Sequence, residues 1–480
     1  MATASIHFDL LRLSPIIVPF ITALLFIGFI SAYKQKDESL RMTAHVLALL
    51  SSIAGFVLAM VNYAQLKTEP TSLALSGFVR YDKLGYELTA LIFVVLFIGI
   101  SVSMLDSKVG YGIEKVSLML ISAAGMISMC FGNNLLGLFV SLEVFSIPLY
   151  VLVSLSSNKE KSLKGGLTYF VMGAVASGIL VYGVALFYAS TGSTQLWGNS
   201  LDNLYTTQPV FIISLILVVI GFLFKVGCLP FSFWVPKAYE SAPLSTVAFM
   251  SAGSKIAATA ALLRMFSNGY VKDLSFLPQI KVVLIIAAVV SAIFGAASAN
   301  RQNHFVRIFA YSSMVHAAFL VASVMAGSDF AKYYLVAYSL TASLTFAWCA
   351  IWAHVTQEYK LTLPEFYEVS RTHPFMAAVL VVLLFSNAGI PMTVGFLGKF
   401  YVAQGLIEAD LLWLALVLLF ASIASTVAYL KVLSAIFYSK EEIIFKDKNY
   451  ERRPQLRFVQ GVLAVGAVVV VVLGSSSILL

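Results

Sequence analysis

Charged residues are scarce in this chain, and cysteines are few. Only 11% of the 480 residues are charged, whereas about 25% is usual in soluble domains, and this excludes a large soluble core. Cys130, Cys228 and Cys349 lie far apart within apolar runs, a spacing that excludes a metal, iron–sulfur or disulfide motif among them. We expect these cysteines to be small buried hydrophobic residues.

Cofactor motifs are also missing. The sequence has no nucleotide-binding loop, no haem motif and no low-complexity tail. The links between its apolar runs are too short for a folded soluble domain. We therefore expect no cofactor and no redox centre on this chain.

Long apolar runs are what the sequence has instead. Hydrophobic residues make up 60% of the chain, and repeated runs of about 18 or more predict an all-α, multi-pass membrane protein. The N-terminus has no basic region and no small-residue cleavage site, so we expect a retained first helix rather than a signal peptide. The fourteen predicted spans are residues 13–33, 43–63, 86–106, 113–131, 134–155, 164–190, 209–228, 244–268, 276–300, 305–326, 330–355, 375–407, 410–438 and 456–477.

The net charge of +8 is explained by orientation in the membrane. The basic residues lie mostly in short loops, a pattern that does not indicate a nucleic-acid partner. Loops after odd-numbered spans carry 19 lysines and arginines, and the opposite side, with the N-terminal tail, carries 8. The positive-inside rule then places both termini outside the cytoplasm.

Two parts of the chain resemble each other. The stretch "LFKVGCLP" at 223–230 is similar to "LFSNAGIP" at 384–391, and each has a proline six residues after its phenylalanine. Spans 4–8 and 9–13 then form two copies of a five-helix unit. Because five is odd, consecutive copies must be inverted in the membrane. Inverted repeats with broken helices are typical of transporters.

This similarity predicts four regions. The first three helices occupy residues 1–112, the first repeat 113–268, the second, inverted repeat 269–440, and the last helix 441–480. Helices 7 and 12 are the predicted broken helices, interrupted at Pro230 and Pro391.

Four charged residues lie deep within predicted spans: Glu143, Lys225, Lys255 and Lys399. Each costs about 2.5–3.5 kcal/mol at the membrane centre even on the most lenient scale, so it must face the bundle interior or water and have partners. A fifth, Lys431, is near a helix end, where we expect it to reach the interface.

A proton relay explains these charges better than static ion pairs, although static pairs remain the alternative. Burial favours the neutral form of a lysine and a nearby carboxylate favours the charged form. A change in distance between them can therefore load or release a proton. We expect Glu143 to supply the movable charge and Lys225 to carry the proton. Lys255 lies among small residues, which leave room for water.

The two prolines support the same prediction. Pro230 cannot donate to the carbonyl of Val226, and Pro391 cannot donate to that of Asn387. The freed backbone groups need water or polar partners. We therefore expect a polar, hydrated spot beside Lys225 and another close to Lys399. Proline kinks alone are common in membrane helices, but a kink next to a lysine occurs here twice.

His316, in the tenth span, could link the two half-paths, because an imidazole exchanges protons near neutral pH. The alternative is a hydrogen-bonding helix contact. Further hydroxyls could hold waters, at Tyr311, Ser312, Ser313 and Thr341. The other histidines near these spans, His304, His354 and His373, are expected at the interface.

Several stretches together resemble one family. They are "SLEVFSIPLY", "LFKVGCLPFSFWVPKAYESAP", "SAGSKIAATAALLRMF", "RIFAYSSMVHAAFLV" and "NAGIPMTVGFLGKFYV". They are similar, in order and spacing, to the antiporter-like membrane subunits of bacterial proton-pumping NADH–quinone oxidoreductase, respiratory complex I. Leu142-Glu143 replaces the Trp-Glu of sister groups, so the resemblance is strongest to the subunit N group.

The resemblance implies fourteen helices with two inverted repeats and broken helices 7 and 12. It matches Glu143 to the helix-5 glutamate, Lys225, Lys255 and Lys399 to the lysines of helices 7, 8 and 12, and His316 to a helix-10 histidine. It also implies other membrane-arm subunits as partners, some of them homologous, with flavin and iron–sulfur clusters on other chains. The expected location is the bacterial inner membrane.

The sequence departs from the family's patterns, and two of the departures concern lysines. A frequent helix-6 lysine is replaced by Thr168, with Lys164 one turn earlier. Lys237 stands where an aspartate is common, and it is either a loop lysine or a second carrier.

Three functions remain open. The chain could be a proton-translocating subunit of complex I, a stand-alone or multisubunit sodium or potassium/proton antiporter, or a passive scaffold.

Overall fold

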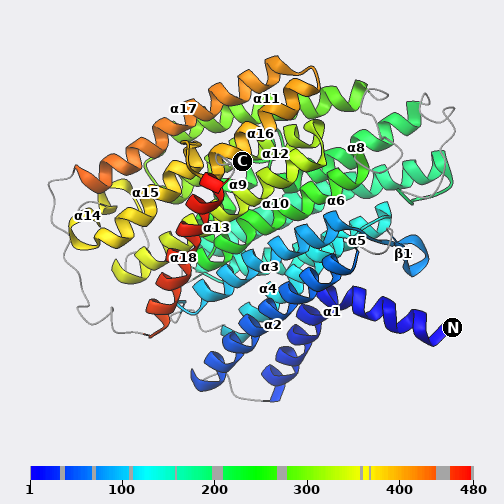
Figure 1. Cartoon of the computed structure of the whole chain (residues 1–480), viewed down its shortest axis with the longest axis horizontal. Coiled ribbons are helices and arrows are strands. Elements are labelled where there is room, and N and C mark those ends of the chain that lie inside the picture. Colours follow the sequence, from blue (N-terminus) through cyan, green and yellow to red (C-terminus); the bar gives the residue numbers. More distant parts are fainter. Residues whose placement is uncertain are drawn as a thin grey trace.

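The computed structural model is a bundle of long helices with one short β-hairpin (Figure 1). It describes residues 2–32, 38–66, 72–106, 112–156, 159–196, 209–266, 278–356, 361–366, 369–438 and 454–476. The helices are α1 (Ala2–Ala32), α2 (Glu38–Gln65), α3 (Lys83–Ser103), α4 (Gly112–Cys130), α5 (Leu135–Ser154), α6 (Lys159–Thr191), α8 (Pro209–Val226), α9 (Trp234–Ser241), α10 (Leu244–Phe266), α11 (Pro278–Asn300), α12 (Phe305–Ala326), α13 (Ser328–Thr356), α14 (Val369–Thr372), α15 (Pro374–Ala388), α16 (Val394–Glu408), α17 (Leu412–Phe437) and α18 (Pro454–Ser476).

The prediction of an all-α membrane protein is confirmed. Within the described residues, 13 helices are long and apolar enough to cross a membrane, one fewer than the fourteen predicted spans. The difference lies in predicted span 375–407, which is two helices, α15 and α16, of 15 residues each. Each is only about 22 Å long, short of the roughly 30 Å hydrocarbon core, so the two are needed for one crossing.

The helix is interrupted at both predicted positions, Pro230 and Pro391. Helix α8 ends at Val226, and α9 begins only at Trp234. Gly227 has φ +84°, and the amide of Cys228 donates to the carbonyl of Leu223, a common way to end a helix. Helix α15 ends in the same manner at Ala388, and the next residue, Gly389, also has φ +84°. The inverted-repeat relation remains a prediction, and its boundaries at 268 and 440 fall outside the described residues.

The helix at the centre of the bundle is α10. It packs against α3, α4, α8, α12 and α13, and its apolar window is wholly buried, although its mean hydropathy of 1.4 is the lowest of the 13 long helices in the described residues. Helices α1 and α2 lie at the periphery (Figure 1), and α18, like α1, has only 28% of its apolar window buried. The helix with the least apolar sequence is therefore the one furthest from lipid, as expected where polar residues serve a buried path.

The link between α2 and α3 contains structure that the sequence did not reveal. Strands β1 (Ser72–Ala74) and β2 (Val79–Tyr81) pair antiparallel, with Leu73 opposite Arg80. A 3₁₀ turn, Leu75–Gly77, joins them. Strands of three residues are too short to produce a readable alternation.

Candidate functional site

Four of the five predicted relay residues are buried. Lys225, Lys255, Lys399 and His316 are 1–5% exposed, and they lie on α8, α10, α16 and α12. Glu143, on α5, is half-buried and therefore reaches the surface of the bundle. The structure thus places Glu143 at the edge of the helix bundle and the three lysines and the histidine inside it.

Lys225 lies among aromatic rings. Its Nζ donates a 3.0 Å hydrogen bond to the hydroxyl of Tyr150. Ring centroids of four aromatic residues lie 4.8–5.6 Å from the same Nζ: Phe145, Tyr150, Tyr169 and Phe224. Such rings attract a cation through their faces. Lys225 therefore lies in an aromatic cage with one hydroxyl, and the hydrated spot expected beside it stays a prediction.

Glu143 does not pair directly with Lys225. Within the described residues, no carboxylate oxygen lies within 4.0 Å of its Nζ, and Glu143 instead accepts a hydrogen bond from Ser177 of α6. Glu143 and Tyr150 are seven residues apart on α5, so they share a face about 10 Å apart along the axis. Tyr150 therefore bonds the lysine and shares a helix face with the acid.

Lys255 lies beside the break that follows α8. A Cβ at Gly227 would be 4.0 Å from its Nζ. That Nζ donates to the backbone carbonyl of Ser313, at 2.6 Å, and lies 5.0 Å from the ring of Tyr338. The break thus adjoins Lys255 as well as Lys225, which the sequence did not indicate.

His316 connects to the same tyrosine. Its ring centroid is 5.1 Å from that of Tyr338, and its Nδ1 is 2.8 Å from the hydroxyl of Tyr334. The Tyr338 ring, which lies 5.0 Å from the Nζ of Lys255, is thus a neighbour of both Lys255 and His316. The role of His316 as a link to Lys399 stays a prediction.

Lys399 is held by oxygen atoms. Its Nζ donates to the carbonyls of Asn387 (2.6 Å) and Ala388 (2.9 Å) and to the hydroxyl of Ser422 (2.8 Å). Asn387 is the residue whose carbonyl Pro391 was expected to free, and this carbonyl accepts a hydrogen bond from Lys399 in the structure. The end of α15 thus serves directly as the lysine's binding site.

The other residues that the sequence singled out on helices α6, α9 and α17 do not contact Lys225, Lys255, His316 or Lys399 in the described residues. Lys164 is exposed and pairs with Glu160, and the hydroxyl of Thr168 donates to the Lys164 carbonyl. Lys237 is exposed on α9. Lys431 is exposed and donates to the carbonyl of Asn300 at the end of α11, and its expected place at the membrane interface stays a prediction.

The hydroxyl candidates differ among themselves. Ser313 contacts Lys255 only through its carbonyl, Ser312 bonds the hydroxyl of Tyr429, and the hydroxyl of Thr341 donates to backbone carbonyls of its own helix. His304 and His373 precede helices α12 and α15 at their first turns. None of these side chains bonds a relay lysine in the described residues.

Three tyrosines next to the charged residues were not predicted from the sequence. Tyr150, Tyr334 and Tyr338 provide the hydroxyls and rings between the charged groups. A phenol buried in an apolar run needs a hydrogen-bond partner, so tyrosines deep within spans were the available signal.

A cavity of about 150 Å³ opens among the loops that follow odd-numbered spans. Its lining includes Asp106, Lys161, Tyr239, Glu240 and His354. Burial alone would raise the pKa of Glu240, but hydrogen bonds from Lys161 and Arg307 hold it below the ordinary value. Tyr239 also neighbours the Ser313 side chain, so the cavity approaches the surroundings of Lys255.

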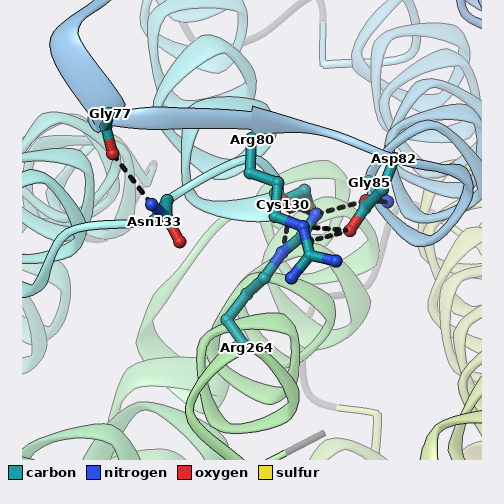
Figure 2. Close-up of polar contacts among 7 residues, drawn as sticks. All are labelled: Gly77, Arg80, Asp82, Gly85, Cys130, Asn133 and Arg264. Atoms are coloured by element: carbon teal, nitrogen blue, oxygen red, sulfur yellow. Dashed lines mark hydrogen bonds and ion pairs between the residues drawn. The ribbon is translucent and has the colours of Figure 1, made fainter. Parts of the chain in front are cut away.

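A cluster of charged residues lies at the C-terminal end of α10 (Figure 2). Arg264 pairs with Asp82 through both terminal nitrogens and donates to the carbonyl of Cys130. Burial alone would raise the pKa of Asp82, but Arg264 and the amide of Gly85 hold it below its ordinary value. Arg80 and Arg264 are two of the eight basic residues counted above on the side of the N-terminal tail, and both are under 10% exposed.

Comparisons with known proteins agree on one family. The family described as "NADH:quinone oxidoreductase/Mrp antiporter, TM" matches residues 132–425. NADH-quinone oxidoreductase subunit N of Bdellovibrio bacteriovorus is 31% identical over 451 residues, which is 90% of each chain. Subunit N of Parvibaculum lavamentivorans is 31% identical over 414 residues, 85% of this chain and 83% of that one.

Solved structures show the same fold. A chain of respiratory complex I from Thermus thermophilus with bound aureothin has a TM-score of 0.80 at 25% identity, covering 96% of both chains. A chain of the Mrp complex from Dietzia sp. has a TM-score of 0.83 at 17% identity, covering 98% of this chain and 95% of that one. The chain therefore belongs to the NADH:quinone oxidoreductase/Mrp antiporter membrane-subunit family.

Proposed function

We propose that this chain is a proton-translocating membrane-arm subunit of an NADH–quinone oxidoreductase, of the subunit N type. The observation that carries the proposal is the line of buried bases, Lys225, Lys255, His316 and Lys399, each with a defined hydrogen-bond partner. The subunit N relatives support complex I over the Mrp antiporters, because they match across most of both chains.

In the proposed mechanism, protons pass between neighbouring bases. When Glu143 moves toward Tyr150, its charge favours the protonated form of Lys225. When it moves away, Lys225 releases a proton toward Lys255, next to the same helix break. Tyr338 and His316 connect Lys255 to the second half, where Lys399 exchanges the proton with the far side.

The chain's own residues supply no redox chemistry in this proposal. Flavin and iron–sulfur clusters belong to other subunits, and energy released there shifts Glu143. Partners are other membrane-arm subunits, including homologous ones. We also propose the bacterial inner membrane as the location, with both termini on the periplasmic side, and the two inverted repeats, 113–268 and 269–440, as the two halves of the relay.

The first test replaces Lys225 or Glu143 by alanine. Membranes with either variant should assemble the complex but lose most NADH-driven proton pumping, measured with a pH-sensitive dye. Lys164→Ala is the matched control, since Lys164 is exposed and pairs only with Glu160 in the described residues. Normal pumping with Lys225→Ala would refute the relay.

Two further outcomes identify the alternative functions. A scaffold predicts less assembled complex with an unchanged proton-to-electron ratio. An antiporter predicts sodium- or potassium-driven proton movement without NADH, and no flavin or iron–sulfur subunits in the purified complex.

A further inference from the structure

Helix α18 leaves open space beside it. It packs against α3, α13, α15 and α16 (Figure 1), yet only 28% of its apolar window is buried. It approaches α13 closely at Gly466, where a Cβ would lie 2.5 Å from Cδ2 of Leu344. At Gly461, five residues earlier, a Cβ would meet no atom within 4 Å. The helix is therefore tightly packed at one level and loosely packed at another.

The open space belongs to a crevice of about 800 Å³ between α2, α3, α13 and α18. The α3 residues that line it recur every three or four positions and so share one face of the helix: Glu87, Ala90, Leu91, Val94, Phe97 and Ile98. From Glu87 to Ile98 the helix rises about 16.5 Å. One leaflet contributes roughly 15 Å to the hydrocarbon core. The crevice thus has the length of the acyl chains of one leaflet.

Charge is confined to the two ends of this crevice. Among the described residues that line it, the charged ones are Glu87 and Arg457. Arg457 precedes Phe458, whose ring centroid is 6.4 Å from that of Phe97, ten residues along α3 from Glu87. The lining between the two ends is apolar, so the crevice suits a molecule with long apolar chains.

At the Glu87 end, the crevice continues into a second space of about 780 Å³, which shares Glu87, Leu91 and Val336 with it. Asp329 and Lys332 of α13 also line this space. Nζ of Lys332 lies 3.1 Å from Oε2 of Glu87 and 2.9 Å from Oδ1 of Asp329. Two carboxylates thus share one ammonium, and the ionised cluster has an excess of negative charge.

Tyrosines surround the same cluster. Tyr333 and Tyr401 line the second space, with ring centroids 4.6 Å apart, and the side chain of Tyr63 hydrogen-bonds with Glu87. Tyrosine is enriched at the depth where lipid headgroups lie, and its ring face attracts ammonium groups. The acid excess and the rings together favour a headgroup that carries an ammonium, and Lys332 provides a positive charge for a phosphate.

We propose that the crevice binds a zwitterionic phospholipid with a primary ammonium headgroup, such as phosphatidylethanolamine, from the leaflet on the side of Glu87. The acyl chains lie between α3 and α18, the phosphate faces Lys332, and the ammonium donates to Glu87 and Asp329. Phosphatidylglycerol has no ammonium, and the trimethylammonium of phosphatidylcholine has no N–H donor. The bound lipid completes the packing of α18 against α3, and this role does not depend on proton transfer.

The test uses a photoreactive lipid. The purified complex is placed in vesicles of phosphatidylethanolamine and phosphatidylglycerol with a trace of phosphatidylethanolamine that carries a diazirine in the middle of one acyl chain. After illumination, mass spectrometry of the peptides locates the label. We expect label on residues from three walls of the crevice, Val94, Leu340 and Val465.

A substitution that fills the crevice should remove this label. Gly461→Leu places a side chain in the open space without a clash at its Cβ, and the label on Val94 and Leu340 should be lost. Gly28→Leu is the matched control. Gly28 is also a helical glycine whose Cβ would meet no atom within 4 Å, but it lies on α1. Its label in the crevice should equal that of the wild type.

A second comparison tests the headgroup. In the wild-type complex, the phosphatidylethanolamine probe should label the crevice about fivefold more strongly than probes with a phosphatidylglycerol or phosphatidylcholine headgroup, as expected of one ion pair at a partly exposed site. Glu87→Gln removes the acid excess, so this preference should disappear while the crevice itself is still labelled.

Several results would overturn the proposal. An assembled wild-type complex without label in the crevice would do so, and it would indicate that a helix of another subunit fills the space. Label that Gly461→Leu does not lower would also overturn it. Equal labelling by the three wild-type probes would refute the ammonium headgroup, and this comparison needs no variant. Pumping is not measured, so the outcome is independent of the Lys225→Ala result.

Discussion

Lys225 and Lys399 lie at comparable places in the chain but in different surroundings. Each is close to a helix that ends before a proline, and the two endings have similar sequences. Lys225 is surrounded by aromatic rings and bonds one hydroxyl, whereas Lys399 bonds three oxygen atoms. Similar motifs have therefore produced two kinds of lysine site.

The difference concerns how each site holds its proton. A ring face contributes about 0.5–2 kcal/mol to a cation, and rings do not accept a proton in transfer. A hydrogen bond to a charged group contributes roughly 1.5–3 kcal/mol, and Lys399 makes three. Lys225 thus has one exchange route, through Tyr150, while Lys399 is anchored by groups that remain fixed at the end of α15.

The largest expected effect comes from arginine at either position. Arginine keeps the charge but does not release its proton, so both Lys225→Arg and Lys399→Arg should abolish NADH-driven pumping. The variants should differ in assembly. A guanidinium stacks well on aromatic faces, so Lys225→Arg should assemble like the wild type.

Lys399→Arg should instead reduce the amount of complex on native gels, because a planar fork does not fit three oxygens arranged around an ammonium. Full pumping by Lys225→Arg would show that this lysine acts only as a fixed charge, and equal assembly of the two variants would remove the contrast between the sites.

Some of this contrast could be predicted from the sequence. The cost of charge in a membrane identified the lysines, and the missing amide of Pro391 identified the carbonyl of Asn387 as a free acceptor. Both inferences need only residues close in sequence. The fold class followed from apolar runs for the same reason.

What could not be predicted depends on contacts between distant helices. In the aromatic cage of Lys225, Tyr150 of α5 and Tyr169 of α6 pack against α8. The sequence near Lys225 gives no indication of this contact. Arg264 counts among the basic residues on the side of the N-terminal tail because it is near the end of its span. Its burial follows only from the position of Asp82, 182 residues away.

An intermediate effect should separate the two tyrosines of the cage. Tyr150→Phe keeps the ring but removes the hydroxyl that Lys225 bonds, and pumping should fall about tenfold, as expected from losing a charge-assisted hydrogen bond. Tyr169→Phe is the matched control. Its ring lies 5.1 Å from the same Nζ, yet its hydroxyl is buried without a hydrogen-bond partner among the described residues.

The measurement is the initial rate of dye quenching per assembled complex. Equal losses in both tyrosine variants would mean that the rings, rather than the Tyr150 hydroxyl, govern proton transfer at Lys225.

The smallest effect is expected at the other lysine. Ser422→Ala removes one of the three acceptors of Lys399 and leaves the carbonyls of Asn387 and Ala388 in place. Pumping should fall by only about threefold, because the two carbonyls continue to hold the ammonium and offset most of the roughly 1.5–3 kcal/mol of one hydrogen bond to a charged group. The control is Ser425→Ala, one turn along α17, whose hydroxyl donates to the carbonyl of Ser422 rather than to the lysine. If Ser422→Ala were as damaging as Tyr150→Phe, the backbone carbonyls would not be the principal anchor. Lys399 would then depend on a single hydroxyl, as Lys225 does.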